Sequence, residues 1–176
     1  MRVAASITHL GLSARLIAPA LAATASGYRL DMPLGDLWWQ DQLGGPVPLS
    51  IPRPADDAAR PFHGQNLPDK QLQELMDGVI DPITAATSRL VKISQRVLWG
   101  NVASAINSAW AQVTAQVPEL GAPAHAAAVS ASRHRRLIRE RQPPGPAFRR
   151  TSCCLLYRLT PGSSRPVCGD CVLANR

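Results

Sequence analysis

Four cysteines close to the C-terminus are the residues of this 176-residue chain with the clearest capacity for chemistry. Cys153 and Cys154 are adjacent, and 13 residues separate them from the C-x2-C turn formed by Cys168 and Cys171. Thiolates are soft ligands that bind zinc, hold iron–sulfur clusters or pair as disulfides. The segment therefore predicts a metal centre or a cross-linked tail.

Four interpretations of this spacing are open. Two structural disulfides require an oxidising compartment. A redox C-x2-C motif requires a following helix that lowers the thiol pKa, and the 5 residues after Cys171 are too few for one. A structural zinc site suits the C-x2-C turn, but adjacent cysteines depart from its usual spacing. A [2Fe–2S] cluster needs four thiolates, two per iron, and the glycine of the turn, Gly169, would let backbone N–H groups approach sulfur.

No other catalytic arrangement stands out in the sequence. The histidines have neither metal-site nor triad spacing, and no phosphate-binding glycine loop or dinucleotide fingerprint is present. They are His9, His63, His125 and His134. A redox reaction at the cysteines would therefore need a separate electron donor.

Positive charge is concentrated in the same quarter of the chain. Residues 1–132 carry 9 Lys and Arg against 10 acidic residues, whereas residues 133–176 carry 10 Arg against 2 acidic residues. The arginines between positions 133 and 141 suit a solvated helix end. Phe148 is the only aromatic residue between positions 133 and 150, so no nucleic-acid partner is expected. An anionic membrane surface remains a partner for such charge, with peripheral contact at the inner membrane.

The elements that must position this segment are predicted to be helices, so the fold class is all-α. In residues 1–27, apolar side chains recur at helical spacing and predict an amphipathic core helix. They are Ile7, Leu10, Ala14, Ile17 and Leu21. An export signal is the weaker alternative, because Arg15 interrupts the apolar run. No stretch approaches about 18 uninterrupted apolar residues, so no membrane span is expected.

Residues 31–68 are rich in proline and predict a surface loop region with at most a short strand at Val47–Ile51. The pair Trp38 and Trp39 is expected to anchor this region in the core. A ligand platform is the alternative for these two side chains.

Four further helical stretches follow in the sequence. The first runs from Pro68 through Val79, and Asp81-Pro82 begins the second as N-cap and first residue. Leu90 and Leu98 carry the apolar face of this second helix. A break or a tight packing point is expected at residues 99–101, and the third stretch continues to Pro118. The last predicted helix spans residues 124–141.

These elements divide the chain into three predicted parts. Residues 1–141 form a helical domain, residues 142–147 a stiff proline-rich linker, and residues 148–176 a small C-terminal module whose loops wrap the metal centre.

The cysteine segment resembles the C-terminal signature of FhuF-type ferric siderophore reductases. The resemblance is carried by Arg149–Leu159 (RRTSCCLLYRL) and Cys168–Leu173 (CGDCVL). It extends in patches to residues 99–105 (WGNVASA), residues 10–12 (LGL) and residues 14–16 (ARL). Only the cysteine segment is highly specific.

The resemblance implies a cytoplasmic enzyme that reduces siderophore-bound Fe³⁺ through a [2Fe–2S] cluster, and the basic segment adds the expectation of membrane association. The implied ligands are Cys153, Cys154, Cys168 and Cys171, and nearby arginines would tune the cluster or steer substrate. These arginines are Arg149, Arg150, Arg158 and Arg165. A non-enzymatic, zinc-stabilised module that binds an anionic partner through its basic tail is the alternative function.

Two features depart from the family pattern. The connection between the cysteine pairs is three residues longer here, which adds roughly 0.2 kcal/mol of loop-closure free energy. Family members also have additional chain before the segment that opens this sequence, so an N-terminal shortening is expected.

Overall fold

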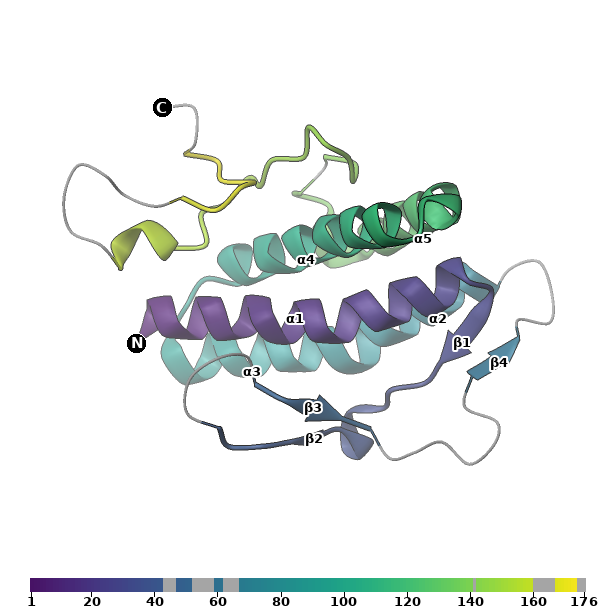
Figure 1. The fold of residues 1–176 in the computed structure, drawn as a ribbon. Coiled ribbons are helices and arrows are strands. Elements are labelled where there is room, and N and C mark those ends of the chain that lie inside the picture. The colour runs from purple at the N-terminus through teal and green to yellow at the C-terminus, as the bar shows by residue number, and fades with distance from the viewer. Residues whose placement is uncertain (43–46, 52–58, 62–66, 141, 160–166, 174–176) are drawn as a thin grey trace.

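The protein is a helical body around one central helix, with a C-terminal segment lying on its outer side (Figure 1). The computed structural model describes residues 1–42, 47–51, 59–61, 67–140, 142–159 and 167–173. The α-helices are α1 (Arg2–Ala25), α2 (Leu67–Leu75), α3 (Asp81–Val91), α4 (Gln95–Gln116) and α5 (Gly121–Ser132). A π-helical turn, η2 (Met76–Ile80), joins α2 to α3. Short 3-10 turns are η1 (Leu34–Asp36), η3 (Pro118–Leu120), η4 (Arg135–Leu137) and η5 (Leu156–Arg158). The all-α class predicted from the sequence is confirmed.

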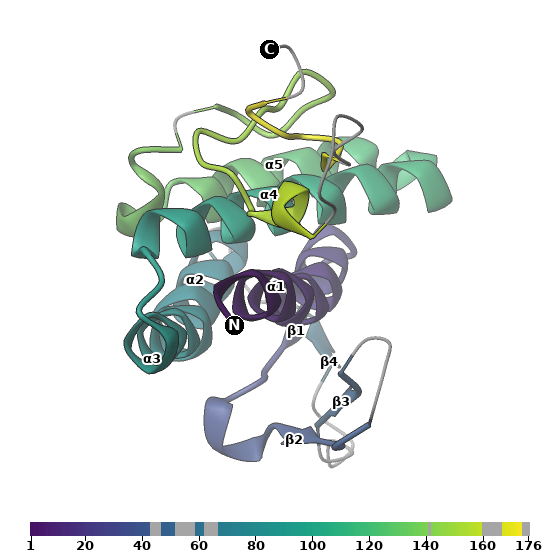
Figure 2. The ribbon, with the colours of Figure 1, turned by 90° about the vertical axis from the view of Figure 1, so that its left-hand side faces the viewer.

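Helix α1 is the centre of the body. In the end-on view it lies between the α4–α5 layer and the strands, with α2 and α3 beside it (Figure 2). Its C-terminal half buries Leu16, Ile17 and Leu21 in the apolar core. Its N-terminal half instead buries Ser6, His9 and Ser13, while the predicted core residue Ile7 is 37% exposed. The predicted apolar face is therefore wrong in this half, because the buried side chains there hydrogen-bond to α3 and α4.

Among the described residues, one helix, α1, is long and apolar enough to cross a membrane by length and composition. The absence of a long uninterrupted apolar run predicts no such candidate, so the two criteria differ at α1. Within the fold α1 packs against α4, α5 and α3, and the apolar side chains of its C-terminal half belong to the core, as the amphipathic pattern predicted.

Helices α2 and α3 form one continuous rod through η2. Asp81 was predicted to cap a new helix, but its backbone is helical (φ −62°, ψ −47°). The prediction is wrong because the π-helical turn ahead of Pro82 lets the helix continue past a residue that lacks an N–H donor. The Asp81 carboxylate instead forms ion pairs with Arg135 and Arg136, which follow α5.

The rod ends earlier than the apolar pattern predicted. Lys92 takes a left-handed conformation (φ 50°), and Ser94 starts α4 by accepting a hydrogen bond from Arg96 N at 3.2 Å. Leu90, predicted to lie on the apolar face, is 82% exposed. The serine N-cap is a recognisable signal for this boundary, and the continuing apolar pattern obscured it.

Helix α4 is continuous through residues 99–101, which are all buried. The tight-packing alternative is therefore confirmed and the break is wrong. A side chain at Gly100 would collide with Ser152 Oγ and come within 3.1 Å of Arg150 Nη2. Glycine here allows the C-terminal segment to lie directly against the helix.

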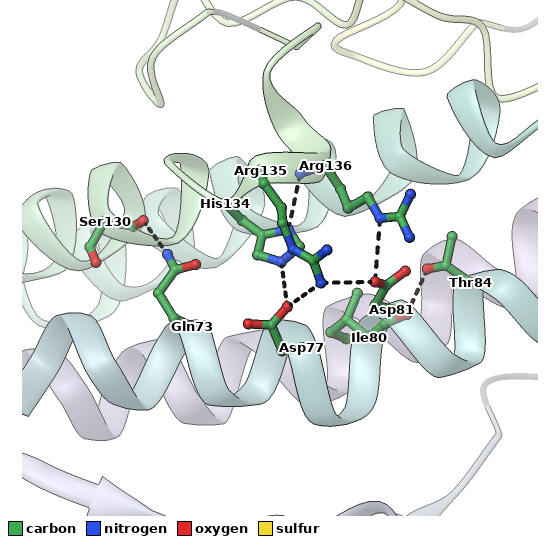
Figure 3. A network of polar contacts seen from close by, with 9 residues as sticks. All are labelled: Gln73, Asp77, Ile80, Asp81, Thr84, Ser130, His134, Arg135 and Arg136. Carbon is green, nitrogen blue, oxygen red and sulfur yellow. Dashed lines mark hydrogen bonds and ion pairs between the residues drawn. The ribbon is translucent and has the colours of Figure 1, made fainter.

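Helix α5 ends at Ser132, not near residue 141, and the chain turns through η4 (Figure 3). The turn is held by polar contacts to the α2–α3 rod: His134 Nε2 lies 3.1 Å and Arg135 Nη2 2.8 Å from Asp77 Oδ1. Arg136 Nε lies 3.3 Å from Asp81 Oδ2. The His134 ring also stacks on Trp99, with centroids 5.3 Å apart. These long-range contacts end a helix that composition alone would extend.

Two small antiparallel ladders cover the other side of α1. Strand β1 (Tyr28–Leu30) pairs with β4 (Ala59–Pro61), and β2 (Trp38–Trp39) pairs with β3 (Leu49–Ser50). β3 falls within the strand predicted at residues 47–51. The Trp38 and Trp39 side chains are 68% and 64% exposed, so their prediction as core anchors is wrong. They line the wall of an apolar hollow with Leu12, Leu37 and Leu49.

Candidate iron–sulfur centre

The C-terminal segment crosses over α4, on the side of that helix away from α3 (Figures 1 and 2). Ser152 Oγ donates to Arg96 O at 3.0 Å, and Arg96 Nη2 donates to Thr151 O at 3.3 Å. Arg150 N donates to Asp170 O at 3.0 Å, which joins the two ends of the segment. The two cysteine pairs are thereby brought to one place on the surface of α4.

The residues before the segment are also bound to the helical body. Gly145 N donates to Asn107 Oδ1 of α4 at 2.8 Å, and His125 Nε2 of α5 lies 3.1 Å from Pro144 O. Phe148 is buried in the main core.

Two of the four thiols are in direct contact. Cys154 Sγ and Cys168 Sγ are 3.4 Å apart, and all four cysteines are free of disulfides. Cys154 and Cys171 are buried, whereas Cys153 and Cys168 are partly exposed. In the described part of the chain, no group of three or more His, Cys, Asp or Glu side chains is arranged as a ready metal site. The structure thus brings Cys154 and Cys168 into contact and places Cys153 and Cys171 on the turns beside them.

Backbone N–H groups donate to the sulfurs of the two flanking cysteines. Leu155 N lies 3.3 Å from Cys153 Sγ, and Leu173 N lies 3.3 Å from Cys171 Sγ. Both donors are two residues after their cysteine, so the two halves of the centre repeat one local pattern. Such N–H donors stabilise a negative sulfur.

The first of these turns requires an unusual backbone. Leu155 has φ 69° in the left-handed region, which costs a side-chain-bearing residue on the order of 1 kcal/mol. In the second turn, Cys171 N donates to Cys168 O at 3.0 Å. A side chain at Gly169 would meet nothing within 4 Å. The close approach that the sequence assigned to Gly169 is therefore made by Leu155 and Leu173.

The two thiols in contact have pKa values shifted in opposite directions. Contact with Cys168, backbone N–H groups and the charge of Arg150 together lower the pKa of Cys154 to about 6, against the opposing effect of burial. The same contact raises the pKa of Cys168. Burial raises the pKa of Cys153, although the Leu155 N–H and Arg150 oppose it. The site therefore favours a thiolate at Cys154.

Arg150 differs from the other described arginines near the centre because it is only 1% exposed. Its Nη2 donates to Asn101 Oδ1 at 2.6 Å and to Val97 O at 3.3 Å. Its Nε and Nη1 are buried and have no hydrogen-bond partner. Asn101 Nδ2 in turn donates to Ser6 O at 2.9 Å. A guanidinium beside the cysteines is thus tied to α4 and, through Asn101, to α1.

The other predicted arginines have different positions. Arg149 is exposed and its Nη1 donates to the neighbouring Phe148 O at 2.8 Å. Arg158 is exposed and its guanidinium carbon lies 5.6 Å from the centroid of the Tyr157 ring. Arg165 lies outside the described residues. Of the three predicted arginines that the structure describes, Arg150 alone is buried.

Three residues that support the centre were not singled out as site residues from the sequence. Glu140 accepts from Thr151 N at 3.0 Å and from Thr151 Oγ1 at 2.6 Å. Asn101 and Ser152 hold the segment on α4. The patch at residues 99–105 pointed to this part of α4, whereas Glu140 had no signal because it lies in a run of arginines.

The donor set suits an anionic thiolate cluster. Four thiols, backbone N–H groups aimed at two of them, and a buried cation with unused donors are what such a cluster requires. The described histidines have other partners: His9 contacts Thr84, His134 contacts Asp77 and His125 contacts Pro144, whereas His63 lies outside the described residues.

Comparison with known proteins supports the same assignment. Residues 150–173 match the family model described as FhuF 2Fe-2S C-terminal domain. No curated protein and no solved structure matches the chain. The match begins at Arg150 and includes all four cysteines. Residues 150–173 of this chain are thus similar to the 2Fe-2S domain that closes FhuF-type proteins.

Proposed function

We propose that the protein is a ferric-siderophore reductase. The observation that carries this proposal is the match of residues 150–173, which include all four cysteines, to the FhuF-type 2Fe-2S domain. A [2Fe–2S] cluster supplies one-electron transfer when bound there. One electron reduces chelated Fe³⁺ to Fe²⁺, which oxygen-rich chelators hold far less tightly, so the metal is released and the free chelator remains. The electron comes from a separate one-electron donor, which is oxidised.

The chain's own residues have limited tasks in this reaction. Cys153, Cys154, Cys168 and Cys171 would hold the cluster, and the N–H groups of the flanking turns would stabilise its sulfurs. No acid, base or nucleophile is needed, because no covalent bond to the chelator must be cleaved.

A hollow next to the cysteine turn suggests where the substrate approaches. It has a volume of about 530 Å³, and Asn107, Trp110, Arg149, Gly169 and Asp170 contribute to its lining. Arg149 and the further exposed arginine Arg158, together with Arg165, would attract an anionic ferric chelate. We place the reaction in the cytoplasm. The exposed arginines of residues 133–176 would make peripheral contact with an anionic membrane surface.

Anaerobic spectroscopy tests the cofactor and the activity separately. The purified protein should show visible absorption that bleaches with dithionite, with two irons and two sulfides per chain. Adding a ferric chelate to the bleached protein should restore the colour and release Fe²⁺, detected with a colorimetric Fe²⁺ chelator. The matched control is the Cys154→Ser variant, which should release no iron above the buffer rate.

Two results would contradict the proposal in different ways. A colourless protein holding one zinc would favour the non-enzymatic binding module with a basic tail. A coloured protein that stays bleached after ferric chelates are added would retain the cluster and exclude the reductase activity.

A further inference from the structure

Arg150 carries a positive charge into the interior without a carboxylate partner. Among the described residues it makes no ion pair, and its hydrogen bonds go to an amide and a backbone carbonyl. Glu140 is used by Thr151, and Asp170 meets Arg150 through its backbone oxygen. An isolated buried charge is strongly unfavourable unless a countercharge is near.

The groups that face Arg150 do not supply that countercharge by themselves. From α1 comes His9, whose pKa is lowered to about 4, mainly by burial and then by Arg150. From α4 come Asn101, Val97 and Gly100, all uncharged. The remaining neighbours are the thiols of Cys153 and Cys154, whose pKa values respond to the charge of Arg150.

An anionic cluster on those thiols is the countercharge that the site lacks. With four thiolates, an oxidised [2Fe–2S] cluster carries a formal charge of −2 and gains another negative charge on reduction. The buried Nε and Nη1 atoms of Arg150 are donors with no other use. We propose that Arg150 is the buried countercharge of the cluster and makes the seating of the 2Fe-2S domain on α4 and α1 depend on cluster binding. The proposal rests on the cofactor and not on the reductase activity.

The contacts around Arg150 would transmit this dependence to the body. Arg150, Asn101 and Ser6 form a chain of hydrogen bonds from the 2Fe-2S domain through α4 to α1. Ser152 is packed on Gly100 in the same place. Without the cluster, the unpaired guanidinium favours release into water, and release of Arg150 must break this chain and lift Ser152 from α4.

Hydrogen exchange of the wild-type protein provides the first test. With the cluster bound, peptides covering residues 97–102 and 148–154 should be protected, and after chelation of the iron both should exchange faster, together. The α5 peptide covering residues 124–131 serves as the internal control and should change little. Equal protection in both states would overturn the proposal.

The Arg150→Met variant provides a second test whose sign is diagnostic. Removing the charge should raise the Tm of the cluster-free protein, lower the reduction potential, and speed loss of the cluster by about tenfold or more. Arg150→Lys should keep most of the potential, and Arg149→Met, which removes an exposed neighbouring charge, should change none of the three strongly. A merely structural Arg150 would instead give a lower Tm in both states and an unchanged potential. If Arg150→Met does not fold, the lysine variant and the wild-type exchange experiment still decide the matter.

Discussion

Cys154 is a buried thiol in direct contact with a second cysteine. It touches Cys168 at 3.4 Å, is 4% exposed, and has the lowered pKa of the pair. Its neighbour Cys153 lies on a turn with its own N–H donor. The two adjacent thiols thus have different partners, Cys168 Sγ for Cys154 and the Leu155 N–H for Cys153.

Replacing Cys154 by serine should therefore abolish or strongly destabilise the cluster. A serine hydroxyl is a harder and poorer ligand for this metal centre than a thiolate. Visible absorption together with iron and sulfide content measures the loss, and Arg158→Gln, which changes an exposed side chain nearby, is the matched control. A Cys154→Ser protein with the wild-type spectrum would show that the vicinal pair is not a double ligand.

At the scale of elements, the decisive contact is between α4 and the cysteine segment. Gly100 lies in the buried middle of a long helix, where alanine normally stabilises by up to about 1 kcal/mol. Here the added methyl group would collide with Ser152 Oγ and crowd Arg150. Packing thus makes alanine at position 100 destabilising, whereas helix propensity alone would make it stabilising.

The Gly100→Ala variant should lower the free energy of unfolding by about 1–3 kcal/mol, the usual range for overpacking. Chemical denaturation measures this change. Gly78→Ala in η2 is the control, because a methyl group there meets nothing within 4 Å, and its stability should not fall. Adding Ser152→Ala should recover part of the loss, and failure of Gly100→Ala to destabilise would show that the segment does not rest on α4.

The sequence predicted the helical class and the cysteine centre because both depend on local patterns. Periodicity marked most of α1, α2 and α4, and the cysteine spacing marked the segment that the family model matches. Helix ends were missed where distant partners decide them. The α5 terminus depends on Asp77 and Asp81 far earlier in the chain, and the continuous rod depends on a π-helical turn.

The supporting side chains were less predictable than the ligands. Arg149 and Arg150 are identical neighbours in the sequence, yet one is exposed and the other is 1% exposed. Which of them enters the interior is decided by Asn101 and by the space left at Gly100. The same tertiary packing turns Trp38 and Trp39 outward, although large aromatic side chains are usually buried.

At the scale of the whole molecule, the junction of α1, α3 and α4 holds a buried titratable group. His9 Nε2 lies 3.0 Å from Thr84 Oγ1, whose own proton goes to Ile80 O at 2.7 Å. The histidine is therefore the donor through Nε2, and its buried Nδ1 has no partner. Protonating Nδ1 would place a second charge close to Arg150.

This arrangement predicts a specific acid sensitivity. Burial and then Arg150 lower the pKa of His9 from 6.5 to about 4 in the folded protein. In the unfolded chain, His9 takes up a proton near pH 6.5. The contribution of neutral His9 to the free energy of unfolding is therefore complete above that pH and is lost as the pH falls toward 4. The loss is at most about 3 kcal/mol. Denaturation of the cluster-free protein between pH 4 and pH 6.5 should show this slope, and His9→Gln should flatten it. An unchanged slope in His9→Gln would assign the effect to other groups.

The charge asymmetry of the chain is divided by the fold into separate environments. Arg135 and Arg136 form ion pairs with Asp77 and Asp81, Arg150 is buried, and Arg149 and Arg158 are exposed near the cysteines. The positive charge of these described arginines therefore does not form one binding surface for a polyanion. Two of them are in ion pairs, one is buried in the cofactor site, and two are exposed at its rim.

The hydrogen bond from Arg150 N to Asp170 O has a consequence for how this domain can evolve. It joins the backbone just before Cys153 and Cys154 to the backbone between Cys168 and Cys171. The relative position of the two cysteine pairs is therefore set by the residues next to them. The length of the intervening connection then has little effect on where these two flanks meet, so added residues there leave the register of the cysteine pairs unchanged. The three residues by which this connection exceeds the family pattern are a change of that kind, and further length variants should remain competent to assemble the cluster.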